Sequence, residues 1–272
     1  MPTFLNIPDG VDFNTIEGFK QLLPTEEGLN EFQKLQRAWA IEQFTDSYNE
    51  SYDWSATNPP SHHGSIWPYV FKGETVLKEE NPEDGNYCCG VTVENFIRAM
   101  ADFYGKELWE SPSGPTVDDL IQTRHRFFVI SRKYFKGAAF GVDFLVSQLE
   151  YRWENDETNE STSFAEGVGI YAVVNEDPYQ AQFGDYIQIQ PNEDPMSAGH
   201  SCMFVGLDKH YWKGDNHNPP GTYDCIRVFN SNKSNDYGME GGVGFGWYTI
   251  GKKNSAGFKR IFHMGGVRLR TL

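Results

Sequence analysis

The hydrophobic pattern of this chain changes from helical to strand-like near residue 169, and that change constrains the fold more than any other feature. Upstream, apolar residues recur every three or four positions in segments of helical length. Downstream, short apolar stretches are separated by Gly, Pro and Asn turns. The expected strands are residues 170–174, 186–189, 201–206, 225–229, 243–250 and 260–269. Helices followed by strands predict an α+β fold in which an antiparallel sheet packs against a helical half.

The expected helices cover about residues 28–45, 88–105, 116–128 and 137–149. Gly105 is expected to end the second helix, since glycine commonly follows a helix C-terminus. Thr116 and Asp119 form a start similar to a capping box for the third helix. The polar stretch 154–163 predicts an exposed loop.

The composition is that of a folded protein with a sizeable core. The chain has 272 residues, of which 39% are hydrophobic and 15% aromatic. We expect residues 1–80 to be an N-terminal extension, a helix plus loops with a possible role as a lid. Residues 81–272 are expected to form the main domain.

The charge of the chain argues against two classes of partner. The formal net charge is −15 at pH 7, which repels nucleic-acid phosphates and anionic lipid surfaces. No apolar run approaches the ~18 residues of a membrane span, and residues 1–10 lack the basic and apolar regions of a signal peptide. We therefore expect a soluble protein, cytoplasmic or exported by a route other than Sec. The oligomeric state stays open.

Cys88 and Cys89 fall in or just before the first turn of the second expected helix. Backbone N–H groups there have no intrahelical partners, and the helix dipole is positive at that end. Both effects favour a thiolate and lower a cysteine pKa from its usual value of about 8.5. This is a suitable place for a nucleophile, although most free cysteines are simply buried apolar residues.

A thiol nucleophile needs a general base and a polar group that orients the base. His200 begins a strand with apolar residues on both faces. Asn230 and Asn232 follow the apolar core of the next strand, and either can bind one ring nitrogen of His200 and fix its tautomer. Taken singly, such a histidine is usually bonded to a backbone carbonyl, and such asparagines are ordinary turn residues.

The sequence predicts neither a metal site nor an organic cofactor. His62 and His63 are adjacent, so on a regular element their side chains point apart, and no carboxylate or cysteine cluster lies nearby. The four cysteines include no C-x-x-C spacing, and two neighbouring cysteines form a disulfide only with strain.

The segment Cys88-Cys89-Gly90-Val91-Thr92 resembles the nucleophile motif Cys-Ser-Gly-Leu-Thr of the NlpC-type cell-wall peptidases, a branch of the papain-like cysteine hydrolases. In that family a Gly-Asp strand follows, and then a histidine that opens an apolar strand. Here the corresponding segments are Phe-Gly-Asp-Tyr-Ile-Gln-Ile at 183–189 and Gly-His-Ser-Cys-Met-Phe-Val-Gly at 199–206. The ordered resemblance covers residues 86–232.

The resemblance implies a papain-like fold and a triad of the Cys-His-Asn type. Cys88 takes the place of the nucleophile and His200 that of the base. Asn230 is the preferred third residue, with Asn232 as the alternative. The implied reaction is hydrolysis of an amide bond in a peptidoglycan stem peptide or a similar peptide, as an endopeptidase or amidase without a cofactor.

The chain also departs from the family pattern. Tyr87 replaces the usual Asp before the nucleophile, and Cys89 takes the place of the serine; both are expected beside the oxyanion and the substrate. The Tyr-x-Trp-Gly-Gly segment that helps to build the family's substrate groove is absent. The specificity for peptidoglycan is therefore less secure than the triad.

Three other readings of the same residues stay open. The triad can perform acyl transfer or deamidation on another substrate. The domain can be a catalytically inactive binding module on the same fold, in which case Cys88 titrates as an ordinary thiol. The Cys88–Cys89 pair can sense redox state, and mild oxidation would then remove two hydrogens from it.

Overall fold

The computed structural model describes residues 11–12, 14–47, 64–77, 88–128, 137–155, 169–189, 200–212, 221–232, 242–250 and 262–270. The helices are α1 (Ile16–Leu22), α2 (Glu31–Ser47), α3 (Cys88–Trp109), α4 (Val117–Phe128) and α5 (Gly137–Asn155), with 3-10 turns at Glu26–Gly28 and Pro178–Gln180. The strands are β1 (Tyr69–Phe71), β2 (Glu74–Leu77), β3 (Ile170–Asn175), β4 (Tyr186–Ile189), β5 (His200–Trp212), β6 (Gly221–Asn232), β7 (Gly242–Thr249) and β8 (Phe262–Leu269).

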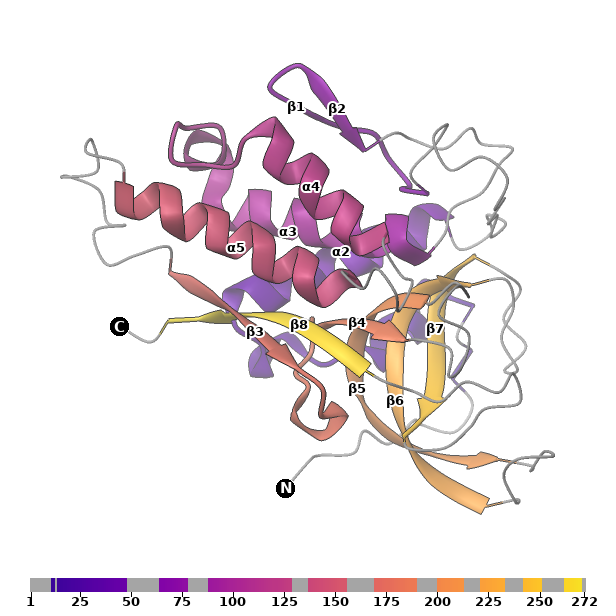
Figure 1. Ribbon diagram of the computed structural model, residues 1–272. Helices are drawn as coiled ribbons and strands as arrows, with labels where there is room; N and C mark the ends of the chain where they lie inside the picture. Colours follow the sequence, from indigo (N-terminus) through magenta and orange to yellow (C-terminus); the bar gives the residue numbers. More distant parts are fainter. Residues whose placement is uncertain are drawn as a thin grey trace.

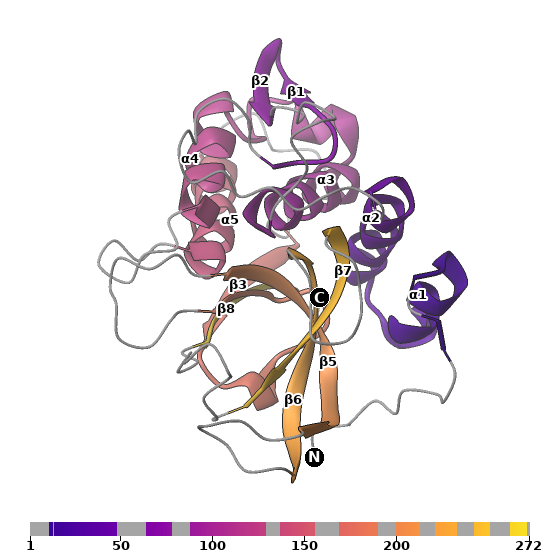
Figure 2. The same ribbon diagram turned by 90° about the vertical axis from the view of Figure 1, so that its right-hand side faces the viewer.

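Strands β3 to β8 form one sheet in the order β3-β8-β4-β5-β6-β7, and each neighbouring pair is antiparallel. The sheet is strongly twisted, and α3, α4 and α5 lie on one side of it (Figure 1). The β1–β2 hairpin lies beyond the helices, away from the sheet (Figure 2). The expected α+β fold with an antiparallel sheet packed on helices is therefore confirmed.

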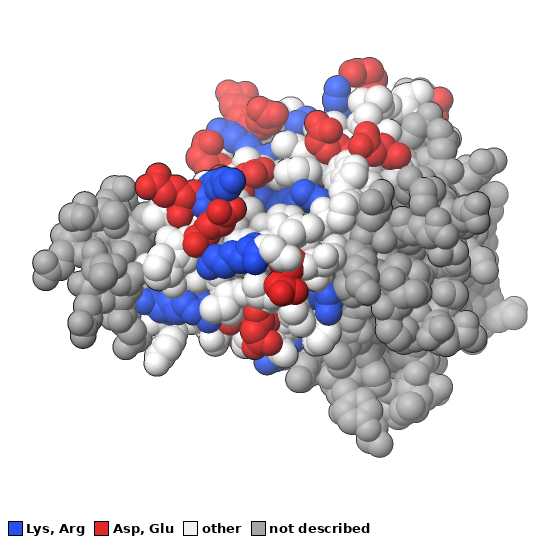
Figure 3. Space-filling view, turned by 90° about the horizontal axis from the view of Figure 1, so that it is seen from above, with Lys and Arg blue, Asp and Glu red and all other residues white. Residues whose placement is uncertain are grey.

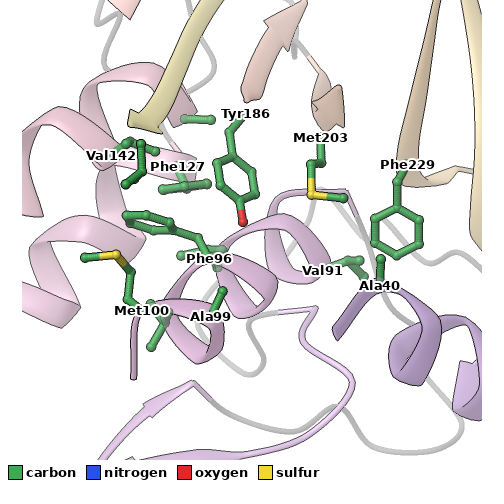
Figure 4. Close-up of a cluster of buried hydrophobic side chains, with 14 of the residues drawn as sticks. Ala40, Val91, Phe96, Ala99, Met100, Phe127, Val142, Tyr186, Met203 and Phe229 are labelled. Atoms are coloured by element: carbon green, nitrogen blue, oxygen red, sulfur yellow. The ribbon is translucent and has the colours of Figure 1, made fainter. Parts of the chain in front are cut away.

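Successive residues of a strand face opposite sides of the sheet, and here both sides are buried. Tyr186, Met203 and Phe229 face the helices, where Phe96 of α3 packs edge-on against Tyr186 with 5.4 Å between ring centroids (Figure 4). The opposite side carries a second apolar cluster: Ile187, Ile189, Cys202, Phe204, Leu207, Ile226, Val228 and Met264. The two-sided apolar pattern of β5 is thereby explained.

Two local signals at helix ends lie where the sequence places them. Thr116 Oγ1 accepts a hydrogen bond from the Asp119 N–H at 3.1 Å, and Asp119 Oδ2 accepts one from the Thr116 N–H at 2.7 Å, which confirms the capping box of α4. Gly105 has φ 70° and ψ 158°, so the first helical segment of α3 ends there as expected. A second short helical segment continues beyond this kink to Trp109.

Other boundaries differ from the expected ones. β5 and β6 are longer than their apolar segments, since their ladder continues from Leu207↔Ile226 to Trp212↔Gly221. A neighbouring strand satisfies the backbone hydrogen bonds of a residue whatever its side chain is. A hydrophobic pattern therefore underestimates the length of strands whose ends contain polar residues. Helix α5 includes residues 154–155 of the expected loop, and the rest of that loop lies outside the described residues. Helix α1 and the β1–β2 hairpin were not expected.

The described part of residues 1–80 shares the core of the molecule. Phe19 of α1 stacks on Phe44 of α2 and on Phe245 of β7, with centroid distances of 4.1 and 4.5 Å. Arg227 of β6 donates a hydrogen bond to the carbonyl of Leu22 at 2.7 Å. These helices are therefore built into the fold, while the division at residue 80 and the role as a lid stay predictions.

The outer side of the helical layer carries both signs of charge. Seen from above, acidic and basic side chains alternate over the described surface, without a broad basic patch on that face (Figure 3). No described helix is long and apolar enough to cross a membrane.

Candidate active site

Three segments that are far apart in the sequence meet at the N-terminal end of α3. Cys88 is the first residue of that helix, His200 is the first residue of β5, and Asn230 lies in the adjacent strand β6. The Cys88 thiol and the Asn230 side chain lie close enough to the His200 ring to raise its pKa. Gly246 of β7 leaves room for this asparagine, because a Cβ there would lie 2.9 Å from Asn230 Nδ2.

The pKa of the Cys88 thiol is held well below its ordinary value. The largest cause is the hydrogen bond from the Cys89 thiol, whose sulfur lies 3.7 Å from that of Cys88. Burial acts in the opposite direction, since Cys88 is only 1% exposed, but the His200 ring and the Ser201 backbone N–H also stabilise the thiolate. The direction agrees with the position of the sulfur at a helix N-terminus.

Cys89 has the opposite titration behaviour from its neighbour. Its pKa is raised well above the ordinary value, first because its proton is engaged in the hydrogen bond to Cys88, and then because it is fully buried beside that thiolate. Cys202 raises it further. The two cysteines thus divide their roles: Cys88 carries the charge and Cys89 is the donor that stabilises it.

The pKa of His200 is raised. Burial alone lowers it, but this effect is outweighed by the charge and hydrogen bond of Cys88 and by the hydrogen bond to Asn230. The buried Nε2 atom nevertheless has no hydrogen bond of regular distance and angle. Together, the lowered Cys88 pKa and raised His200 pKa favour a thiolate–imidazolium pair near neutral pH.

A pair of hydroxyl groups links α3 to β5 near Cys88 and His200. Thr92 Oγ1 lies 2.9 Å from Ser201 Oγ, and it also donates within α3 toward the carbonyl oxygens of Cys88 at 2.8 Å and Cys89 at 3.2 Å. Thr92 and Ser201 are both fully buried. No spacing rule in the sequence pairs these two residues. The signals that point to them are a threonine in the motif around Cys88 and a hydroxyl residue directly after the histidine.

Two residues after Thr92, α3 is anchored by a buried carboxylate. Glu94 accepts hydrogen bonds from the backbone N–H groups of Ile66 at 2.8 Å and Trp67 at 3.1 Å, and from Arg98 Nε at 3.0 Å. Gln43 of α2 donates to it as well, at 3.3 Å. Glu94 therefore fixes α3 to the segment that contains Ile66 and Trp67.

Not every residue proposed from the sequence can be located. Tyr87, His62 and His63 lie outside the described residues. Asn232 is the last residue of β6, beyond the part of that strand whose side chains are described, so Asn230 is the candidate third residue with a located side chain. Among the described residues, no group of three or more His, Cys, Asp or Glu side chains is arranged to hold a metal ion.

Comparisons with known proteins do not place the chain in a family. No family model matches it, and neither a curated protein nor a solved structure matches it. The resemblance to NlpC-type peptidases therefore rests on the motif around Cys88 and on the order of the segments that follow. The interaction of His200 with Cys88 and with Asn230 is a separate observation, which does not depend on the motif.

Proposed function

We propose that this protein is a cysteine hydrolase of the papain-like type that cleaves an amide bond. The observation that carries the proposal is the contact between the Cys88 thiol at the start of α3 and the His200 ring, with Asn230 bound to the same ring. The proposal is also supported by the α+β fold, in which a helix begins with the thiol and a sheet strand begins with the histidine.

The chemistry follows from the charges of the two groups. The Cys88 thiolate attacks the carbonyl carbon, and the backbone N–H groups at the start of α3 stabilise the oxyanion. Imidazolium His200 donates its proton to the amide nitrogen as the carbon–nitrogen bond breaks and a thioester remains. Neutral His200 then takes a proton from water, whose oxygen attacks the thioester. The acid leaves, and the thiolate–imidazolium pair is restored.

The pH dependence has two limbs whose directions are set by the pKa shifts. Because the Cys88 pKa is lowered, the thiolate persists to pH values below the ordinary thiol range. Because the His200 pKa is raised, the imidazolium persists above about pH 6.5, the usual histidine pKa. We expect a bell-shaped rate profile that belongs to the pair, rising on the acid side with thiolate formation and falling when the imidazolium loses its proton.

The substrate class comes from the motif resemblance. A peptide amide in a cell-wall stem peptide, or a similar peptide, is the first candidate, and the proposed mechanism uses no cofactor. Acyl transfer or deamidation requires the same thioester and differs only in the group that attacks it or leaves. Product analysis with and without an added amine separates these reactions from hydrolysis.

The first test is alkylation by iodoacetamide as a function of pH, read by peptide mass mapping. All four cysteines are buried, so Cys202 and Cys225 are internal controls for which exposure alone predicts a rate similar to that of Cys88. We expect Cys88 to react well below neutral pH while the two controls do not. In His200→Gln we expect the rate of Cys88 at pH 6 to fall by about tenfold or more, since an adjacent imidazolium is a main cause of low thiol pKa values.

Hydrolysis of muropeptides is then measured for the wild type and for Cys88→Ala. Release of free carboxyl and amino groups by the wild type alone supports the proposal. If Cys88 reacts no faster than Cys225 at any pH, or if His200→Gln leaves its reactivity unchanged, the enzyme proposal is rejected. The binding-module alternative would then be the better account.

A further inference from the structure

We propose that Thr92 and Ser201 form a clamp that fixes the position of α3, which carries the nucleophile Cys88, along β5, which carries the base His200. The Thr92–Ser201 clamp consists of the two side-chain hydroxyl groups, whose oxygens are 2.9 Å apart, together with the carbonyl oxygens of Cys88 and Cys89 that Thr92 faces. Its consequence for catalysis rests on the proposed function, but its existence as a link between α3 and β5 does not. Thr92 and Ser201 are positioning residues that act through Cys88 and His200.

The number of protons fixes the direction of the hydrogen bonds. Each hydroxyl has one proton to donate and can accept from another donor. Thr92 Oγ1 faces the carbonyl oxygens of Cys88 at 2.8 Å and Cys89 at 3.2 Å, which can only accept. The proton of Thr92 is therefore used within α3, so the proton between the two hydroxyls comes from Ser201. The chain of donors runs from the strand, through Thr92, to the carbonyl of the nucleophile.

Ser201 also binds the nucleophile directly. It follows His200 in β5, and its backbone N–H lies close enough to the Cys88 sulfur to lower the pKa of that thiol. One residue of the strand thus holds both the thiolate and, through Thr92, the carbonyl of the same cysteine. Because Thr92, Ser201 and Cys88 are at most 1% exposed, water cannot readily replace a lost bond. A shift of the helix along the strand would break these bonds together and change the distance between the sulfur and the imidazole.

A threonine bonded to the carbonyl four residues earlier is in itself an ordinary helical feature. Helix α4 contains a matched example, in which fully buried Thr123 donates to the Asp119 carbonyl at 2.7 Å. Among the described residues, the Thr123 hydroxyl makes no bond to another element. The contact with the strand is therefore what distinguishes Thr92, and Thr123 is its control.

The test compares Thr92→Val, Ser201→Ala, Thr92→Ser and Thr123→Val with the wild type. Two quantities are measured for each: the pH dependence of Cys88 alkylation and the free energy of unfolding in denaturant. We expect Thr92→Val and Ser201→Ala to lower the alkylation rate at pH 6 by about tenfold, the equivalent of one lost hydrogen bond of about 1.4 kcal/mol. Thr92→Ser keeps the hydroxyl and should preserve the profile. Thr123→Val should lower stability without shifting the profile.

The two hydroxyls should also be coupled energetically. In a double-mutant cycle, Thr92→Val combined with Ser201→Ala should cost less stability than the sum of the two single changes, because either one already breaks the clamp. Additive effects would reject the clamp. So would unchanged alkylation profiles in well-folded single variants, or an equal shift in Thr123→Val.

Failure of the proposed function would look different from failure of the clamp. If wild-type Cys88 shows no reactivity below neutral pH, the hydrolase proposal fails. The clamp is then tested by the double-mutant cycle alone. A clear coupling between Thr92→Val and Ser201→Ala in the free energy of unfolding supports the link between α3 and β5, and additive effects reject that link.

Discussion

Two buried polar clusters are each built around residues of α3, and they differ in how many of their hydrogen-bonding groups have a partner. The site cluster at the first turn of α3 contains Cys88, Cys89, His200 and Asn230. The anchor cluster one to two turns later contains Glu94 and Asn95 of α3, Gln36 and Gln43 of α2, and Tyr186 of β4. Burial does not distinguish them, since Cys88 and Glu94 are both essentially inaccessible.

In the anchor cluster each side chain has well-formed partners. Tyr186 donates to Asn95 Oδ1 at 2.7 Å, and Asn95 Nδ2 donates to the Gln36 carbonyl at 3.1 Å and to Gln43 Oε1 at 3.2 Å. Gln36 Nε2 in turn donates to the Gly184 carbonyl at 2.7 Å. A polar network satisfied in this way joins two helices and a strand in one arrangement.

In the site cluster a buried ring nitrogen of His200 lacks a regular hydrogen bond, and the Cys89 thiol, which is a weak donor, supplies much of the stabilisation of the charge on Cys88. Unmet hydrogen-bonding capacity in a buried group costs stability, and it is expected where a group must take up and release protons. The anchor cluster therefore holds α3 in place with satisfied hydrogen bonds, while the site cluster at the first turn of the same helix keeps unmet hydrogen-bonding capacity.

The largest effect that tests this comparison is the loss of the anchor. Glu94→Gln replaces one accepting oxygen with an amide that faces donors, so we expect the free energy of unfolding to fall by about 2–4 kcal/mol. Urea denaturation measures it. Glu17→Gln is the control, because Glu17 forms an exposed ion pair with Lys20 at 3.2 Å whose loss should change stability by no more than about 0.5 kcal/mol. Equal effects of the two changes would contradict the assignment of Glu94 as an anchor.

A smaller effect is expected from the donor beside the nucleophile. Cys89→Ala removes the hydrogen bond to the thiolate and should raise the Cys88 pKa, so the alkylation rate at pH 6 should fall by about tenfold. Cys89→Ser retains a donor of similar size and should stay close to the wild type. If alanine and serine behave alike, Cys89 is only a packing residue. A loss of two hydrogens localised to the Cys88–Cys89 pair on mild oxidation would instead favour the redox reading.

The smallest effect on stability is expected in the site itself. His200→Gln removes a ring whose buried Nε2 lacks a regular partner, and we expect the free energy of unfolding to change by less than about 1 kcal/mol while Cys88 loses its reactivity at low pH. Thermal and urea unfolding measure the first quantity, and alkylation the second. A loss of more than about 2 kcal/mol would mean that His200 is mainly structural and would remove the contrast between the two clusters.

The sequence predicted those parts of the structure that depend on local periodicity and local capping. The strand at 186–189 has the expected bounds, the α4 capping box forms between Thr116 and Asp119, and Cys88 begins a helix. Each depends on residues within a few positions of one another. Helix α1 was missed because it has only seven residues, and its buried face, with Phe19 and Leu22, is recognisable only once it packs on α2 and β7.

For the candidate site, the residue types could be predicted from the sequence: a cysteine at a helix start, a histidine that opens a buried strand, and two asparagines near the end of the next strand. Their contacts were visible only in the folded chain, with Asn230 beside the His200 ring, Cys89 as the donor to Cys88, and Ser201 facing Thr92. Periodicity specifies which residues share a face of one element. Contacts between elements depend on the strand order and on the position of α3 along β5, and these are set by the packing of the whole core.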